Sequence, residues 1–179
     1  MRKVILYIAM SIDGYIADEK GGVDWLAGDG SDKDNQGSFP RFIETVDIVI
    51  LGYKTYYQIV TELSPDSWAY LGKKSYVLTH KKLDSTDEII FTDENLSDLI
   101  NRLKLEDGKD IWICGGASIV NQLINLDLID KVCVSLIPTL LGKGISLFTK
   151  HEKEMPLKLI STEINNGIID LFYERRDFK

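Results

Sequence analysis

Residues 111–124 read IWICGGASIVNQLI, and this stretch determines the architecture that the sequence predicts. An apolar run over 111–114 leads through two glycines into apolar residues at helical spacing, namely Ile119, Val120, Leu123 and Ile124. A short strand that is apolar on both faces and runs into a helix is typical of a parallel sheet covered by helices. Gly115 and Gly116 lie at the junction, where either a tight turn or a backbone pressed against a ligand favours residues without a side chain.

The same alternation continues along the chain. Further runs that are apolar on both faces predict strands over 4–10, 48–51, 76–78 and 89–91. Apolar residues at positions i, i+3, i+4 and i+7 predict amphipathic helices over 39–46, 56–63 and 96–103. Ser38, before the first of these helices, is a plausible start residue.

The last third of the chain has a different pattern. It predicts strands over 131–137, 158–164 and 168–175, and Asn165-Asn166-Gly167 between the last two predicts a β-hairpin, because Asn and Gly tolerate positive φ. The fold class is therefore α/β, with a mostly parallel central sheet, helices on both faces and an antiparallel carboxyl-terminal hairpin.

Length and composition exclude several classes of function. The 179 residues predict a single domain over 1–179. The formal net charge is -7 and basic residues cluster only in pairs, so we expect no nucleic-acid partner. No apolar run approaches the roughly 20 residues that cross a bilayer, so we expect no membrane partner and a cytoplasmic protein.

Each of three predicted strands is followed by glycines, by basic side chains or by both. The segments are Gly52-Tyr53-Lys54-Thr55, Thr79-His80-Lys81-Lys82 and Gly115-Gly116-Ala117-Ser118. Ligands of parallel α/β sheets bind outside the carboxyl ends of the strands. Backbone N–H groups at a helix start, hydroxyls and ammonium groups all suit phosphate. The sequence therefore predicts one anionic ligand in a shared crevice.

Four motifs in this order resemble the dihydrofolate-reductase-like superfamily: Ser11-Ile12-Asp13-Gly14-Tyr15-Ile16-Ala17, Leu51-Gly52-Tyr53-Lys54-Thr55-Tyr56, Ile113-Cys114-Gly115-Gly116-Ala117 and residues 137–144. The chain is most similar to the carboxyl-terminal reductase domain of the bacterial riboflavin-biosynthesis deaminase-reductase. The resemblance implies a three-layer dihydrofolate-reductase-like fold. It also implies reduction of a small heterocyclic substrate by a nicotinamide cofactor, as in 5-amino-6-(5-phosphoribosylamino)uracil reductase. A homodimer through the carboxyl-terminal strands is implied as well.

The implied cofactor is NADPH. NADH is the alternative, because Tyr53 stands where family members commonly have an arginine able to pair a 2′-phosphate. A cis peptide between Gly115 and Gly116 is part of the resemblance. By resemblance, the residues at the cofactor are Ala9, Ile16, Gly52, Lys54, Thr55, Leu78, Thr79, His80, Cys114, Gly115, Gly116, Ala117, Ser118 and Ile119.

The sequence motifs identify the substrate-binding residues less closely than the cofactor-binding residues. By resemblance, the loop over 18–38 would close over the substrate with Trp25, which could equally be a buried anchor of the loop, and Phe42 would contact the substrate. Folate reductases have an acidic residue in the first helix, whereas residues 35–42 contain none. Asp13 is the first candidate for a substrate contact or proton donor, the alternative being that Asp13-Gly14 is only a turn. Further candidates for this acid are Asp24, Asp34 and Glu44.

Two other functions stay open at this point. One is dihydrofolate reduction with a relocated acid, and the other is a non-catalytic dinucleotide-binding protein. His80 and His151 are separated in sequence, and no carboxylates have ligand spacing, so we expect no metal.

Overall fold

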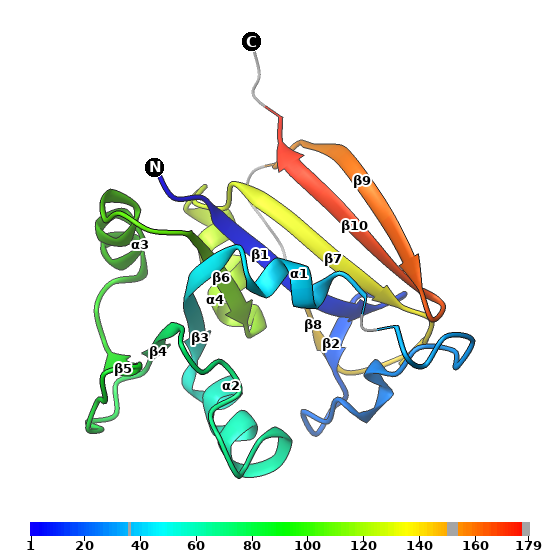
Figure 1. Cartoon of the computed structure of the whole chain (residues 1–179), viewed down its shortest axis with the longest axis horizontal. Coiled ribbons are helices and arrows are strands. Elements are labelled where there is room, and N and C mark those ends of the chain that lie inside the picture. The colour runs from blue at the N-terminus through cyan, green and yellow to red at the C-terminus, as the bar shows by residue number, and fades with distance from the viewer. Residues whose placement is uncertain (36, 150–153, 177–179) are drawn as a thin grey trace.

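A large sheet forms the core of the computed structural model, which describes residues 1–35, 37–149 and 154–176 (Figure 1). Its eight strands lie in the order β5-β4-β3-β6-β1-β7-β10-β9. Their bounds are β1 Val4–Ser11, β3 Val46–Gly52, β4 Lys74–Leu78, β5 Ile89–Thr92, β6 Asp110–Gly115, β7 Lys131–Ile137, β9 Leu157–Asn165 and β10 Ile168–Arg175. All neighbours pair in parallel except β10, which is antiparallel to both β7 and β9. A separate pair joins β2 (Tyr15–Ala17) to β8 (Ile145–Ser146).

Helices cover both faces of this sheet, because alternate side chains of each strand point to opposite faces. Val4 and Leu6 of β1 pack with α3 (Leu96–Leu105) and α4 (Ala117–Asn125). Ile5 and Tyr7 pack instead with α1 (Phe39–Ile43) and α2 (Tyr53–Gln58). In Figure 1, α1 crosses in front of the sheet and α4 lies behind it. The predicted mostly parallel α/β architecture is therefore confirmed.

Most predicted elements are present with small changes at their ends. The apolar stripe over 96–103 is fully enclosed in α3, and the stripe at Ile119, Val120, Leu123 and Ile124 is the buried face of α4. The segment over 56–63 begins earlier, as α2, and continues as a π-helix, Ile59–Leu63.

The predicted first helix is too long by three residues. The structure ends α1 at Ile43 and places Val46 at the start of β3, where it is buried and pairs with Asp110. Thr45 closes the helix by donating its N–H (2.8 Å) and its hydroxyl (2.7 Å) to the carbonyl of Phe42. The helical spacing of Val46 therefore reflects burial in the adjacent strand.

The carboxyl-terminal hairpin is confirmed. Asn166 and Gly167 both have positive φ, 44° and 73°, which is the conformation that a two-residue hairpin turn requires. β9 is the edge strand of the sheet, and its Leu159, Ile160 and Ile164 are exposed. The homodimer expected through these strands stays a prediction.

In the described ranges no helix has both the length and the apolarity needed to span a membrane.

The core makes a first testable prediction. Leu99 of α3 is 0% exposed, so Leu99→Ala should lower the free energy of unfolding by about 3 kcal/mol, through lost burial and a residual cavity. The matched control is Leu105→Ala on the same helix, because Leu105 is 80% exposed and its loss should cost less than about 0.5 kcal/mol. Urea denaturation measures both, and equal losses would contradict the assigned burial.

Candidate active site

The three strand ends predicted to share a ligand lie side by side. Gly115 at the end of β6 pairs with Leu51 of β3, and Gly52 of β3 pairs with Leu78 of β4. The segments that follow these strands therefore leave the sheet at the same edge. The structure thus brings together the segment after β3 and the segment after β6, which are more than 60 residues apart in sequence.

A Cβ would fit at Gly116, so the fold itself does not require a glycine at this position. The Gly115–Gly116 peptide bond is cis, and Gly115 has a φ of 122°, a conformation that favours glycine. Gly116 has a φ of -79°, which any residue adopts, and a Cβ there would make only an ordinary contact, 3.5 Å from Thr55 Oγ1. Space for a side chain thus exists above Gly116, next to a hydroxyl of α2.

The start of α4 offers two unpaired backbone donors of the kind expected. At the start of α4, Ile119 N–H donates to the carbonyl of Gly116 at 3.1 Å, so this N–H group is engaged within the chain. The N–H groups of Ala117 and Ser118 precede the first helical bond and stay directed toward the helix start. The side chain of Ile119 packs against Gly52. If Gly52 carried a Cβ, that atom would lie only 3.3 Å from the Ile119 side chain.

A cavity of about 390 Å³ lies beyond the end of β4. Its lining includes the polar and basic residues predicted at this strand end and residues that follow β5; they are Thr79, His80, Lys81, Lys82, Leu83, Asp84, Phe91, Thr92 and Asp93. Lys81 Nζ lies 4.0 Å from the centroid of the Tyr53 ring, a cation–π contact. This contact links the cavity to the segment after β3, and no sequence pattern predicted it.

The long loop over residues 18–38 is docked at two places. Near its start, Gln58 Nε2 of α2 donates to the carbonyl of Gly21 at 2.8 Å. Further along, Asp29 N–H donates to the carbonyl of Asn166 at 2.9 Å, and Asp32 N–H donates to Asn166 Oδ1 at 3.1 Å. The turn of the carboxyl-terminal hairpin therefore holds the loop that was expected to cover the substrate.

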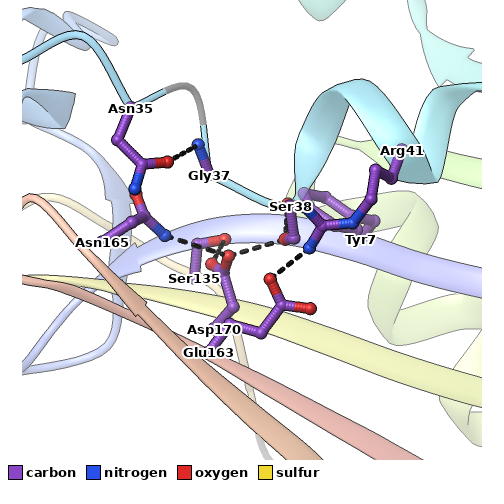
Figure 2. Close-up of polar contacts among 9 residues, drawn as sticks. All are labelled: Tyr7, Asn35, Gly37, Ser38, Arg41, Ser135, Glu163, Asn165 and Asp170. Atoms are coloured by element: carbon purple, nitrogen blue, oxygen red, sulfur yellow. Dashed lines mark hydrogen bonds and ion pairs between the residues drawn. The ribbon is translucent and has the colours of Figure 1, made fainter.

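A buried polar network lies where this loop enters α1 (Figure 2). Asp170 of β10 accepts hydrogen bonds from the hydroxyls of Ser38 (2.6 Å) and Ser135 (2.5 Å). The hydroxyls of Tyr7 and Ser38 are 2.7 Å apart, and Asn165 Nδ2 donates weakly to Asp170 at 3.4 Å. Sequence analysis missed this network, because single polar residues in strands carry no periodic pattern.

Residues 2–169 match the family model of the RibD C-terminal domain. The chain belongs to this family. It is 40% identical over 175 residues to the uncharacterised protein YwjB of Bacillus subtilis (strain 168), which covers 97% of this chain and 98% of YwjB. A putative riboflavin biosynthesis protein from Shewanella sp. PV-4 has a TM-score of 0.86 at 28% identity, over 98% of this chain and 99% of that one.

The RibD C-terminal domain shares its fold with a more distant enzyme. Dihydrofolate reductase from Enterococcus faecalis, complexed with NADP(H) and RAB-propyl, has a TM-score of 0.70 at 15% identity, over 98% of this chain and 97% of that one. This likeness concerns the fold alone. It confirms the dihydrofolate-reductase-like architecture predicted from the motifs.

Asp13 has a clear structural role in this family member. Its carboxylate accepts the Ser11 hydroxyl at 2.6 Å and the N–H groups of Gly142 at 2.7 Å and Leu141 at 3.1 Å. These hydrogen bonds, that of Ser11 first, lower the pKa of Asp13 from its ordinary value. Asp13 is therefore ionised at neutral pH and anchors the loop around Gly142, which favours the turn alternative over a proton donor.

Cys114 is directed into an aromatic cluster. Its Sγ lies 3.4 Å from the Tyr70 hydroxyl, and burial raises the pKa of the Cys114 thiol to about 11. Phe42 is only 9% exposed and stacks on Tyr7 with ring centroids 4.3 Å apart. The structure thus encloses the Phe42 side chain, whereas Cys114 is half-buried beside Tyr70.

Trp25 and the remaining predicted residues lie on several elements and differ in burial. Trp25 is half-buried in a short 3₁₀ helix, Asp24–Leu26, and donates to the carbonyl of Gly22 at 3.2 Å, as a loop anchor does. Ala9 and Ile16 are half-buried, and Lys54 is exposed on α2. The candidate acids Asp24, Asp34 and Glu44 are exposed.

The part of the chain that the structure describes holds no group of three His, Cys, Asp or Glu side chains arranged to bind a metal ion. His151 lies outside the described residues.

The docking of the loop makes a second prediction. A Cβ on Gly28 would overlap the carbonyl oxygen of Asn166, so Gly28→Val should detach the loop from the hairpin turn. Amide hydrogen exchange over residues 18–35 should then become at least about tenfold faster, while exchange in the core strands is unchanged.

The neighbouring exposed residue provides the control. Ala27→Val introduces the same side chain at an exposed position with extended backbone and should leave loop exchange as in the original protein. Equal exchange in the two variants would show that the hairpin turn does not hold the loop.

Proposed function

We propose that this chain is an NAD(P)H-dependent reductase of a small heterocyclic substrate, similar to 5-amino-6-(5-phosphoribosylamino)uracil reductase. The observation that carries the proposal is the open backbone at Gly116, bordered by Thr55 and by the free helix start at Ala117 and Ser118. Membership of the RibD C-terminal domain family supports a reductase, and a dihydrofolate reductase of the same fold is complexed with NADP(H).

The residues around the crevice fit a dinucleotide. The space above Gly116 would hold pyrophosphate, with the Thr55 hydroxyl and the N–H groups of Ala117 and Ser118 as donors. The cavity lined by His80 and Lys81 would hold the adenosine end. Lys54 on the exposed start of α2 would add positive charge to the same side.

For hydride transfer, the protein mainly has to orient the cofactor and the substrate. A bound reduced nicotinamide supplies the hydride. The half-buried side chains of Ala9 and Ile16 would confine the ring and limit access of water to it. Asp13 holds the loop around Gly142 beside the strand that carries Ile16, and so fixes one wall of the site. Because Asp13 is ionised, water is the proposed source of the proton.

One observation favours a second candidate. Helix α1 contains no carboxylate, so a dinucleotide-binding protein without turnover would account for the crevice equally well. Oxidation of NADPH in the presence of a ribosylaminouracil or dihydrofolate would support the reductase. Tight NADPH binding with no turnover of either compound would support the non-catalytic protein instead.

Gly116→Val tests the crevice itself. A Cβ at this position would meet only Thr55 Oγ1, at 3.5 Å, and the φ of -79° suits any residue, so the fold should persist while the valine side chain lowers NADPH affinity at least about 100-fold. Quenching of tryptophan fluorescence measures binding, and thermal unfolding monitors the fold.

Gln122→Val is the control for this substitution. It introduces the same side chain at an exposed position of the same helix and should change NADPH affinity less than about twofold. If Gly116→Val bound NADPH normally, the glycine pair would be only a turn between β6 and α4.

The position of Lys81 leads to a prediction about the preference for NADPH over NADH. Held over the Tyr53 ring, its ammonium group replaces the arginine common in the family as a partner for a 2′-phosphate. Lys81→Ala should weaken NADPH binding about tenfold, since one charge-assisted contact is lost, and leave NADH binding unchanged.

The strand that precedes Lys81 offers a matched control. Lys74 at the opposite end of β4 also lies over a tyrosine ring, that of Tyr76, at 5.9 Å. Lys74→Ala should affect neither cofactor. A parallel loss of NADPH and NADH affinity in Lys81→Ala would refute recognition of the 2′-phosphate.

A further inference from the structure

The cavity beyond the end of β4 carries charges of both signs. Its lining includes two lysines and two aspartates, namely Lys81, Lys82, Asp84 and Asp93. In the part of the chain that the structure describes, neither aspartate takes part in an ion pair, whereas the neighbouring Glu94 binds Arg102 at 2.8 Å. The formal charges of the two lysines and the two aspartates cancel. The cavity is therefore not the strongly positive pocket that a phosphate alone would favour.

Backbone hydrogen bonds bring both aspartates to this cavity. The N–H group of Thr79 donates to the carbonyl of Thr92 at 2.9 Å, so Asp93, the next residue, follows β5 beside the end of β4. Asp84 lies on the segment that connects the two strands. This segment folds back on β5, where an N–H group of the strand donates to the hydroxyl of Ser85 at 3.0 Å. The carboxylates thus come from two different segments and line the same cavity as the lysines.

Lys81 is held at the side of the cavity that faces α2. Its N–H group donates to the hydroxyl of Thr79 at 3.1 Å, and its ammonium group lies 4.0 Å from the centroid of the Tyr53 ring. A cation–π contact orients an ammonium group without neutralising its charge. One cation of the lining is therefore fixed by a neutral ring and keeps its charge for a ligand.

Carboxylates and cations at the adenosine end of a dinucleotide recognise different groups. A carboxylate accepts a hydrogen bond from a free ribose 2′-hydroxyl, which favours NADH, and it repels a 2′-phosphate. A cation pairs with the 2′-phosphate and favours NADPH. A lining with only one of these two kinds of side chain would select one cofactor. Because this cavity contains both kinds, repulsion of the phosphate by the aspartates offsets its attraction by the lysines.

We propose that Asp84 and Asp93 are specificity-determining residues that offset the lysines of the cavity, so that the chain binds NADPH and NADH with affinities within about tenfold of each other. This rests on the proposed function, which places the adenosine end of the cofactor in this cavity. The aspartates accept hydrogen bonds from the adenosine ribose of NADH and oppose the 2′-phosphate of NADPH.

Titration of the full chain with each cofactor tests the proposal. Quenching of tryptophan fluorescence gives a dissociation constant for NADPH and one for NADH, and the ratio of the two constants measures the preference. In the original protein the two constants should differ less than about tenfold. A larger preference for either cofactor would overturn the proposal.

Neutral substitutions of the aspartates should shift this preference toward NADPH. Asp84→Asn and Asp93→Asn should each raise the affinity for NADPH relative to NADH at least about threefold, because each removes one repulsive charge at nearly constant size. The double variant should raise it about tenfold or more. Both aspartates are exposed, so thermal unfolding should stay as in the original protein. An unchanged preference in the double variant would overturn the proposal.

Asp87→Asn is the matched control. Asp87 is exposed on the same segment between β4 and β5, but it is not among the residues that line the cavity. The substitution changes the net charge of the chain by the same amount, and the preference should change less than about twofold. A shift as large as that of Asp84→Asn would reflect net charge alone and would overturn the assignment to the cavity.

Two fragments of the cofactors locate the effect. Adenosine 2′,5′-bisphosphate and 5′-AMP contain only the adenosine end, so their relative affinities should shift in the double variant as those of NADPH and NADH do. A shift that occurs with the whole cofactors and not with these fragments would overturn the assignment to the cavity.

The titrations also separate this proposal from the proposed function. If neither cofactor bound below millimolar concentration, the proposed function would be refuted together with the role of the two aspartates. If both cofactors bound and the double variant kept the original preference, only the role of the aspartates would be refuted.

Discussion

The shared direction of β4, β3, β6 and β1 is the constraint on which the site depends. These four strands are adjacent and parallel, so their carboxyl ends meet at one edge of the sheet. Burial on both faces fixes their register, because a slip by one residue would move apolar side chains between the two cores. Gly115, Gly52 and Leu78 consequently lie in one line, and the proposed dinucleotide follows that line.

The carboxyl-terminal third completes the other side of the molecule. β7 lies beside β1 and places Ser135 next to Ala9, and β10 adds Asp170 to the same row. The turn at Asn166 then holds the loop over 18–38. Ser38, at the end of that loop, gives no side-chain cap to α1 and donates to Asp170 instead. The loop over 18–38, the first helix and the hairpin are thus connected through one buried carboxylate.

Local patterns predicted much of this structure, and long-range contacts account for the rest. The stripe in α3 and the Asn166-Gly167 turn follow from periodicity and φ preferences, which a single segment contains. The strands β2 and β8, three and two residues long, are too short to have a period. The role of Asp13 depends on N–H groups of residues 141 and 142, and that of Asp170 on Ser38 and Ser135, which are distant in sequence. No local pattern contains such partners.

A direct measurement of the dinucleotide crevice is amide hydrogen exchange with and without saturating NADPH. The account predicts joint protection of residues 52–55, 79–82 and 115–119, since these segments leave neighbouring strands at one edge of the sheet. Exchange in the outer hairpin strand β9 should stay unchanged, because it lies at the far edge of the sheet. Protection confined to one of the three segments, or found only elsewhere in the chain, would contradict a shared crevice.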